Sequence, residues 1–473
     1  MITWSNVDSL SAWKKLLSLK GMVSVAAELS GAGASKRIRE YSVPMAEGLT
    51  FNYGAKQVNE QILTALSELS AEAELLEKFE ALYNGEVVNT GEKRKVLHHL
   101  LRGQLGKDVQ ADGVNKRDFY LNEQKRIADF AQKIHDGKIV NEKGETFTSV
   151  CQIGIGGSDL GPRAMYLALE NWAKANGTFK MEAHFISNVD PDDGAGVIAS
   201  LDIARTIFIL VSKSGTTLET LTNESFVKDF IKKAGLDPAK RMIAVTSETS
   251  PLAHNSDYLE AFYMDDYIGG RYSSTSGVGG AVLSLAFGAK VFADFLDGAA
   301  AADKTALNKD IRKNPALLDA LIGIYERNVQ EYPATAILPY SQALSRFPAH
   351  LQQLDMESNG KSVNREGGKI DYATGNAEPL FAKKAGDFRR AGHERSALVL
   401  SAFTSGDGYY PVTVYCIPRK SKRKRHRNRR FYEPDKTFRK RCGTDCRVRL
   451  RKIRFRFKQK FCRRPPVKSY LRR

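Results

Sequence analysis

The sequence predicts an α/β fold built on a doubly wound parallel sheet. From residue 147 onward, short apolar runs of the kind expected for buried parallel strands alternate with segments of helical periodicity. Two of these runs, at 149–154 and 206–211, end in an abrupt turn of Gly, Ser and Thr that opens a helix. Alternating strands and helices form open sheets that bind ligands at the carboxyl ends of their strands.

The individual elements follow from the positions of the apolar runs. Strands are expected at 149–154, 182–187, 206–211 and 242–246, with helices at 161–174 and 217–234. Further along, residues 281–297 and 304–328 are expected to be helical, and residues 334–339 to begin a second sheet.

Residues 1–115 are expected to form a mostly helical region. Apolar residues at helical spacing predict one helix over 55–82, and a second helix is expected over 90–102. His98 and His99 are adjacent, so they point to different faces of that helix and do not form a metal-binding pair. We expect both to pack in the core or at its rim.

The net charge of +18 is confined to the end of the chain. Residues 419–473 hold 26 Lys and Arg against 3 Asp and Glu, whereas the other 418 residues hold 46 against 51. The main part of the chain is therefore mildly acidic, and its charge does not indicate a nucleic-acid-binding protein.

The chain up to residue 415 contains one cysteine, Cys151, which fits a reducing compartment. Without a visible signal peptide or membrane-length apolar run, we expect a soluble, cytoplasmic protein with no membrane partner.

The two Gly, Ser and Thr turns are candidate phosphate-binding sites. The first reads Gly-Ile-Gly-Gly-Ser at 154–158, and the second reads Ser-Lys-Ser-Gly-Thr-Thr at 212–217. The first N–H groups of a helix have no internal partner and carry partial positive charge, so two such turns suit a phosphate ester. The spacing matches neither the dinucleotide-binding fingerprint nor a Walker loop. The alternative is that both are ordinary strand-to-helix turns with Ser and Thr as N-caps.

Two further segments carry groups suited to chemistry on an anionic ligand. Arg271 lies in a glycine-rich turn at 269–280, where a cation suits a bound anion or a developing oxyanion, although a surface arginine on a flexible loop is the alternative. Residues 352–361 combine amides, two carboxylates and a lysine. A carboxylate there could act as a general base, but these residue types alone do not choose between Asp355, Glu357 and a solvated acidic turn.

Together these segments resemble the glucose-6-phosphate isomerases, the aldose–ketose isomerases of glycolysis and gluconeogenesis. Four motifs, in the order and at the spacing of that family, carry the resemblance, which covers roughly residues 1–375. They are Ile-Gly-Gly-Ser-Asp-Leu-Gly-Pro at 155–162, Ser-Lys-Ser-Gly-Thr-Thr at 212–217, Asp-Tyr-Ile-Gly-Gly-Arg-Tyr-Ser at 266–273 and Gln-Gln-Leu-Asp-Met-Glu-Ser-Asn-Gly-Lys at 352–361.

The resemblance implies two sugar-isomerase (SIS) type α/β lobes with helical extensions, a homodimer, and no metal or organic cofactor. We expect a helical region at 1–115, the first lobe at 116–290 and part of the second at 291–380. Glu357 would move a proton between C2 and C1 of a hexose 6-phosphate, Arg271 would face the cis-enediolate, and Gln353 would lie against the substrate. The phosphate would be held by Gly157, Ser158, Ser212, Lys213, Ser214 and Thr217.

The resemblance stops near residue 380. The family next has a Gly-Thr-Asn-Gly-Gln-His motif, whose His helps to open the sugar ring, and later a catalytic Lys on a C-terminal helix; neither is present here. In the reading frame that starts one nucleotide later, codons permitted for residues 392–407 can encode 16 consecutive residues of the family sequence. This stretch begins with the missing motif Gly-Thr-Asn-Gly-Gln-His. For example, GGG-CAC-GAA-CGG contains GGC-ACG-AAC-GG. We therefore interpret the chain beyond about 376–392 as out of frame, which resequencing codons 370–410 would test.

This interpretation makes residues 381–473 an aberrant, disordered basic tail that does not follow the family fold. It also predicts little isomerase activity on closed-ring sugar for this chain. The alternative is a real basic arm that binds RNA or DNA, which we do not expect to be functional. Two other functions remain open: a regulator that binds sugar phosphate without catalysis, and an isomerase that prefers another hexose phosphate.

Overall fold

A five-stranded parallel sheet forms the centre of the fold. The computed structural model describes residues 2–46, 48–103, 105–332, 334–375 and 412–413. The strands are β5 (Ser149–Ile153), β6 (Glu182–Ile186), β7 (Thr206–Val211), β8 (Met242–Ser247) and β9 (Glu260–Met264), in the order β6-β5-β7-β8-β9. The four predicted strands are confirmed to within one residue at each end. β9 was not predicted, because its apolar run, Ala-Phe-Tyr-Met at 261–264, is short and this edge strand is partly exposed.

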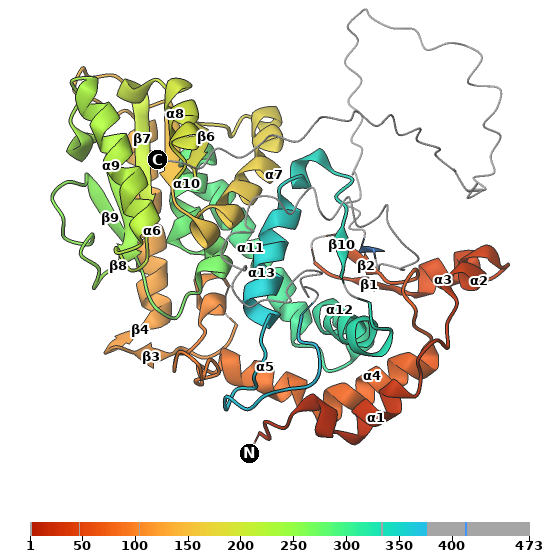
Figure 1. The fold of residues 1–473 in the computed structure, drawn as a ribbon. Helices are drawn as coiled ribbons and strands as arrows, with labels where there is room; N and C mark the ends of the chain where they lie inside the picture. Colours follow the sequence, from red (N-terminus) through yellow and green to blue (C-terminus); the bar gives the residue numbers. More distant parts are fainter. Residues whose placement is uncertain (1, 47, 104, 333, 376–411, 414–473) are drawn as a thin grey trace, which may run out of the picture. The chain divides into compact units, whose positions relative to one another are not determined.

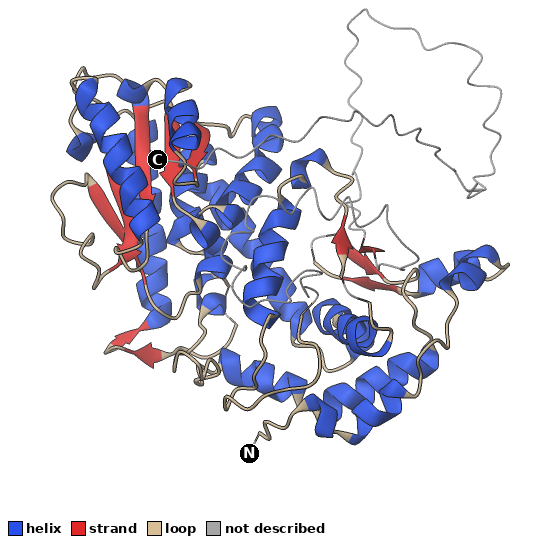
Figure 2. Cartoon of the chain, viewed as in Figure 1, coloured by secondary structure: helices blue, strands red, loops and turns tan. Residues whose placement is uncertain are grey.

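Helices cover both faces of this sheet (Figures 1 and 2). They are α6 (Lys116–His135), α7 (Leu160–Asn176), α8 (Pro191–Ala199), α9 (Leu218–Lys233), α10 (Gly277–Phe287) and α11 (Ala289–Ala306). On one face, buried strand residues such as Val150 and Ile209 share a core with α6, α7, α10 and α11. On the other, Phe208 and Leu210 pack with residues of α8 and α9. The α/β fold class and the doubly wound sheet are thus confirmed.

The strand order places both glycine-rich turns at one edge of the sheet. The chain passes from β5 to β6 on one side, then returns to β7 on the other side of β5, so the order reverses between β5 and β7. The turn at 154–158 follows β5 and the turn at 212–217 follows β7, so both leave the carboxyl edge of neighbouring parallel strands. This is the position at which open α/β sheets bind ligands.

The N-terminal region is helical but differs in detail from the prediction. It contains α1 (Ser11–Leu17), α2 (Val25–Ser30), α3 (Ala34–Glu40), α4 (Glu60–Glu72) and α5 (Leu75–Tyr83), with the hairpins β1 (Ser42–Pro44)–β2 (Thr50–Asn52) and β3 (Gln110–Ala111)–β4 (Val114–Asn115). The single helix predicted over 55–82 is wrong, because Glu74 adopts a left-handed conformation (φ 50°) between α4 and α5. The helix predicted over 90–102 is also wrong: a bridge between Asn89 and Arg94 and a 3₁₀ turn at His98–Leu101 take its place.

The remaining described elements pack against this region or lead to the site. They are α12 (Pro315–Ile324), β10 (Ala336–Ile337), α13 (Phe347–Asn359) and β11 (Val412–Thr413), and β10 pairs with β11 in parallel. Leu318 of α12 shares a buried core with Leu16 and Ile62. The helix predicted over 281–297 is broken at Gly288 (φ 91°), whereas the strand predicted near 334–339 is confirmed by β10. The predicted helix over 304–328 is interrupted before Pro315, where the Asn314 side chain caps α12.

Within the tail expected to be disordered at 381–473, the described residues Val412–Thr413 form β11, so that expectation is wrong at these two positions. Residues 376–411 and 414–473 lie outside the described residues. The domain boundaries at 115, 290 and 380 stay predictions. Within the described residues, no helix is both long enough and apolar enough to cross a membrane.

Gly157 lets the turn after β5 contact the turn that carries Arg271. A Cβ atom at position 157 would lie 2.2 Å from the carbonyl carbon of Gly270 and 2.6 Å from the backbone nitrogen of Arg271. The Ser273 hydroxyl joins the same two turns, donating to the Gly157 carbonyl oxygen at 3.3 Å and to that of Gly270 at 2.6 Å. The two backbones therefore pack directly against each other, and only glycine fits at position 157.

Substituting Gly157→Ala is expected to lower the free energy of unfolding by about 3 kcal/mol, because the added methyl group forces the two backbones apart. The matched control is Gly196→Ala, on an exposed part of α8 where an added Cβ meets nothing within 4 Å. That change should raise stability by about 0.5–1 kcal/mol. Chemical denaturation measures both, and a neutral effect of Gly157→Ala would show that the contact is not required.

Candidate active site

Two of the predicted residues, Arg271 and Gln353, donate hydrogen bonds to the carboxylate of a third, Glu357. Gln353 and Glu357 lie one helical turn apart on α13, and Gln353 Nε2 donates to Glu357 Oε1 at 3.0 Å. Arg271 approaches from the 3₁₀ segment Gly270–Thr275 and donates through NH1 to Glu357 Oε2 at 3.1 Å. Each oxygen of Glu357 thus has its own donor, while the side chain stays 50% exposed and accessible to a ligand.

Glu357 lies in a helix, which excludes the solvated acidic turn that the sequence had left open for this segment. Residues 352–359 are not a solvated acidic turn but belong to α13, which begins with Pro348 in its first turn and ends before Gly360. At the end of the helix, the Lys361 ammonium group donates to the main-chain carbonyl oxygen of Glu357. A cation at this end also interacts favourably with the helix dipole.

Arg271 is held by neighbours on both sides. Its Nε donates to the Ser358 hydroxyl at 2.8 Å, so the guanidinium bridges two consecutive residues of α13. Its side chain is 28% exposed, less than that of Glu357, and lies over the Tyr272 ring. The cation and the carboxylate are therefore placed together before any ligand arrives.

The turn after β7 has open donors at the start of α9. The Ser212 hydroxyl accepts from the Gly215 N–H at 3.2 Å, and the Ser214 hydroxyl accepts from the Thr216 N–H at 3.2 Å. Thr217 is the N-cap residue of α9, yet its side chain makes no capping hydrogen bond. Ser212 is buried, whereas Ser214 and Thr217 are exposed. The helix therefore presents uncapped N–H groups beside two exposed hydroxyls, an arrangement suited to an anion.

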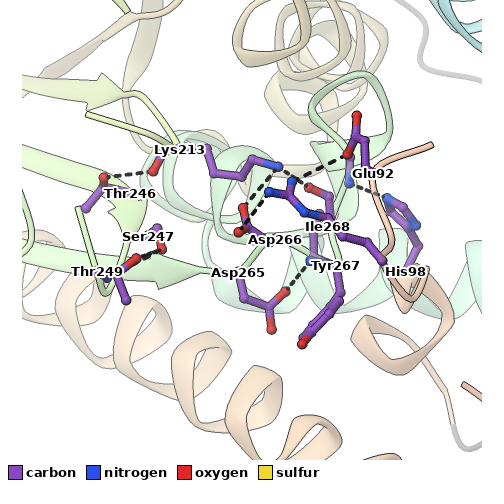
Figure 3. A network of polar contacts seen from close by, with 12 residues as sticks. Glu92, His98, Lys213, Thr246, Ser247, Thr249, Asp265, Asp266, Tyr267 and Ile268 are labelled. Atoms are coloured by element: carbon purple, nitrogen blue, oxygen red, sulfur yellow. Dashed lines mark hydrogen bonds and ion pairs between the residues drawn. The ribbon is translucent and has the colours of Figure 1, made fainter. Parts of the chain in front are cut away.

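Lys213 connects this turn to the loop that leads to Arg271. Its ammonium group lies 3.6 Å from Asp266 Oδ1 and 3.5 Å from the Ile268 carbonyl oxygen (Figure 3). The turns carrying Ser158, Lys213 and Arg271 thus surround the carboxyl ends of β5 and β7. Within the described residues, no group of three His, Cys, Asp or Glu side chains is arranged to hold a metal ion.

His98 contributes to this site, a role that no motif in the sequence indicates. Its Nε2 accepts a hydrogen bond from the Gly269 N–H at 2.9 Å, and its ring meets the edge of Tyr272. Burial lowers the pKa of His98 to about 3, so the ring is neutral and able to accept this bond. The predicted packing role is correct but incomplete, since 171 residues separate the two partners and no local pattern reveals the contact.

Asp265 anchors the same loop to α6. Its two carboxylate oxygens accept from the Tyr120 hydroxyl at 2.9 and 3.0 Å, and the Lys116 ammonium lies 3.3 Å away. Burial raises the pKa of the Asp265 carboxyl, and the charge of Lys116 opposes this shift. The loop before Arg271 is thus fixed by Asp265 at one point and by His98 at another.

The neutral state of His98 predicts a pH-dependent stability. Because its pKa is lower in the folded state, the unfolded chain binds an extra proton between pH 6.5 and about 3, so stability falls as the pH falls through this window. His98→Gln should reduce the slope of unfolding free energy against pH by about 1.4 kcal/mol per pH unit. His99, whose pKa burial lowers to about 4, contributes equally to both proteins. Equal slopes in denaturation experiments on the two proteins would contradict this account.

Comparison with known proteins identifies the family of the chain. A family model described as phosphoglucose isomerase matches residues 52–387. The glucose-6-phosphate isomerase of Treponema denticola is 59% identical over 376 residues, which is 79% of this chain and 71% of that protein. The one of Borreliella burgdorferi is 46% identical over 378 residues, 79% and 70% of the two chains. The crystal structure of a glucose-6-phosphate isomerase from Chlamydia trachomatis has a TM-score of 0.72 at 35% identity, covering 86% of this chain and 75% of that one. The chain therefore belongs to the phosphoglucose isomerase family.

Proposed function

We propose that this chain is an aldose–ketose isomerase that interconverts glucose 6-phosphate and fructose 6-phosphate through a cis-enediolate. The observation that carries the proposal is the carboxylate of Glu357, accessible to a ligand and bound on both oxygens by Gln353 and Arg271. Family membership and the names of the relatives, which are glucose-6-phosphate isomerases, support isomerisation of glucose 6-phosphate.

The proposed roles follow from the chemistry of the reaction. A proton next to a carbonyl group is weakly acidic, so a fixed carboxylate must meet it while a cation stabilises the oxyanion that forms. Glu357 takes the proton from C2 and returns it to C1, and Arg271 faces the enediolate oxygen. Gln353 holds the second oxygen of the carboxylate and so sets its orientation.

The two turns at the edge of the sheet would bind the phosphate. Backbone N–H groups near Gly157 and at the start of α9 supply donors, together with side chains of the predicted set. These are Ser158, Ser212, Lys213, Ser214 and Thr217. Since the phosphate is remote from the reacting carbons, its binding energy serves to position C1 and C2 against Glu357.

The departure from the family motifs limits the activity proposed for this chain. Without the motif whose His helps to open the ring, turnover should depend on the fraction of substrate that is already open. We further propose that the protein works in the cytoplasm, consistent with its free, buried Cys151, and as a homodimer, as the family resemblance implies. Sedimentation of the purified chain measures the latter.

Glu357→Gln tests the function. The amide cannot accept the proton, so incorporation of solvent deuterium at C2 of the substrate should fall by about 10²–10⁴-fold. The shape of the site is retained, so binding of 6-phosphogluconate should stay within about twofold of the wild type, because the phosphate supplies the binding energy.

The control is Asp355→Asn, which removes the other carboxylate of the same segment. Asp355 accepts from Asn359 on α13, whereas Arg271 binds Glu357, so exchange should be unchanged. If the wild-type chain binds hexose phosphate but exchanges no deuterium even at the slow rate at which the sugar ring opens in solution, the protein is a sugar-phosphate regulator rather than an isomerase. Faster exchange with mannose 6-phosphate would instead indicate a different substrate preference.

A further inference from the structure

Lys213, Asp266 and Arg94 form a chain of charges beside the candidate phosphate site. Figure 3 shows that the Lys213 side chain extends from the turn after β7 to the carboxylate of Asp266, on the loop after β9. The nearest distances to this carboxylate are 3.6 Å from Lys213 Nζ and 3.2 Å from Arg94 NH2. The proposed function assigns a role to Lys213 but none to Asp266 or Arg94.

Of the two cations, Lys213 makes the longer contact with Asp266, and its ammonium group also donates to the Ile268 carbonyl oxygen over a long 3.5 Å. Arg94 is closer to the carboxylate, and its guanidinium also contacts Glu92 Oε2 at 3.4 Å. Lys213 is 30% exposed and Asp266 53% exposed, so their ion pair is a partly solvated one of low stability. When Lys213 moves away, Asp266 keeps the guanidinium of Arg94, and no charge is left unpaired.

We propose that Lys213 exchanges Asp266 for the substrate phosphate, and that Asp266 thereby sets the phosphate affinity of the site. This inference rests on the proposed function, because it takes the turn at 212–217 as the phosphate site. A phosphate dianion offers Lys213 more charge and more acceptor oxygens than a carboxylate, so the exchange favours binding. The competing pair lowers the affinity for substrate and product alike, which lets the product phosphate leave.

The test measures binding of inorganic phosphate to the full chain by calorimetry, at a pH where phosphate is dianionic. Asp266→Asn releases Lys213 and should tighten phosphate binding by about two- to fivefold, the range expected for a partly exposed pair. Glu92→Gln is the matched control, because Glu92 contacts Arg94 at 3.4 Å but not Lys213, and it should leave the affinity unchanged. Arg94→Gln should have the opposite effect, since Asp266 would then depend on Lys213 alone.

A second background shows whether Asp266 acts through Lys213. In Lys213→Gln, Asp266→Asn should no longer change phosphate affinity, whereas simple repulsion by the carboxylate would give the same gain in both backgrounds and overturn the proposal. Unchanged or weaker binding in Asp266→Asn alone, with a wild-type chain that binds phosphate, also overturns it and leaves the proposed function intact. A wild-type chain that binds no phosphate overturns both.

Discussion

The close contact between Gly157 and Gly270 is the constraint on which the site depends. With no side chain at position 157, the turn after β5 lies against the backbone that leads into Arg271, at a distance that leaves no space for a Cβ. A similar contact follows at Gly161, where a Cβ would lie 2.0 Å from the Ser274 hydroxyl oxygen. These contacts join the carboxyl edge of the sheet to the segment that carries the cation. They thereby fix the position from which Arg271 reaches Glu357.

The other contacts of the site hold the segment that carries Arg271 in this position. Tyr120 and Lys116 hold the loop through Asp265, and His98 holds it through the Gly269 N–H. Arg271 then bridges the loop and α13 through Glu357 and Ser358. Because these interactions form within the protein alone, little reorganisation is needed when charge develops on a substrate, which is the condition for efficient electrostatic stabilisation.

The sequence was sufficient to predict four of the five strands of the sheet but not the edge strand β9. The inner strands were predicted because they are continuous apolar runs such as 206–211. The sequence was not sufficient where local conformation overrides periodicity. Glu74 and Gly288 interrupt predicted helices with positive φ angles, and the bridge between Asn89 and Arg94 replaces another. In each case the apolar residues keep helical spacing although the backbone leaves the helical conformation.

In the candidate site too, residues that belong to motifs could be predicted, whereas long-range contacts could not. The motifs and the family resemblance selected Arg271, Gln353 and Glu357, and the structure brings all three together. Their roles, and those of the phosphate-binding set, stay predictions. The contacts of His98 with Gly269 and of Arg94 with Asp266 were not predicted, because each joins residues more than 170 positions apart with no motif in common.

We infer that the two turns at the sheet edge and the carboxylate of Glu357 belong to one substrate site. A crystal structure of the chain with bound 6-phosphogluconate tests it most directly. The account predicts the phosphate against Ser158 and the start of α9, with the C1–C2 end of the ligand beside Glu357 and Arg271. A phosphate bound away from both turns, or a ligand whose C1–C2 end lies far from Glu357, would contradict it.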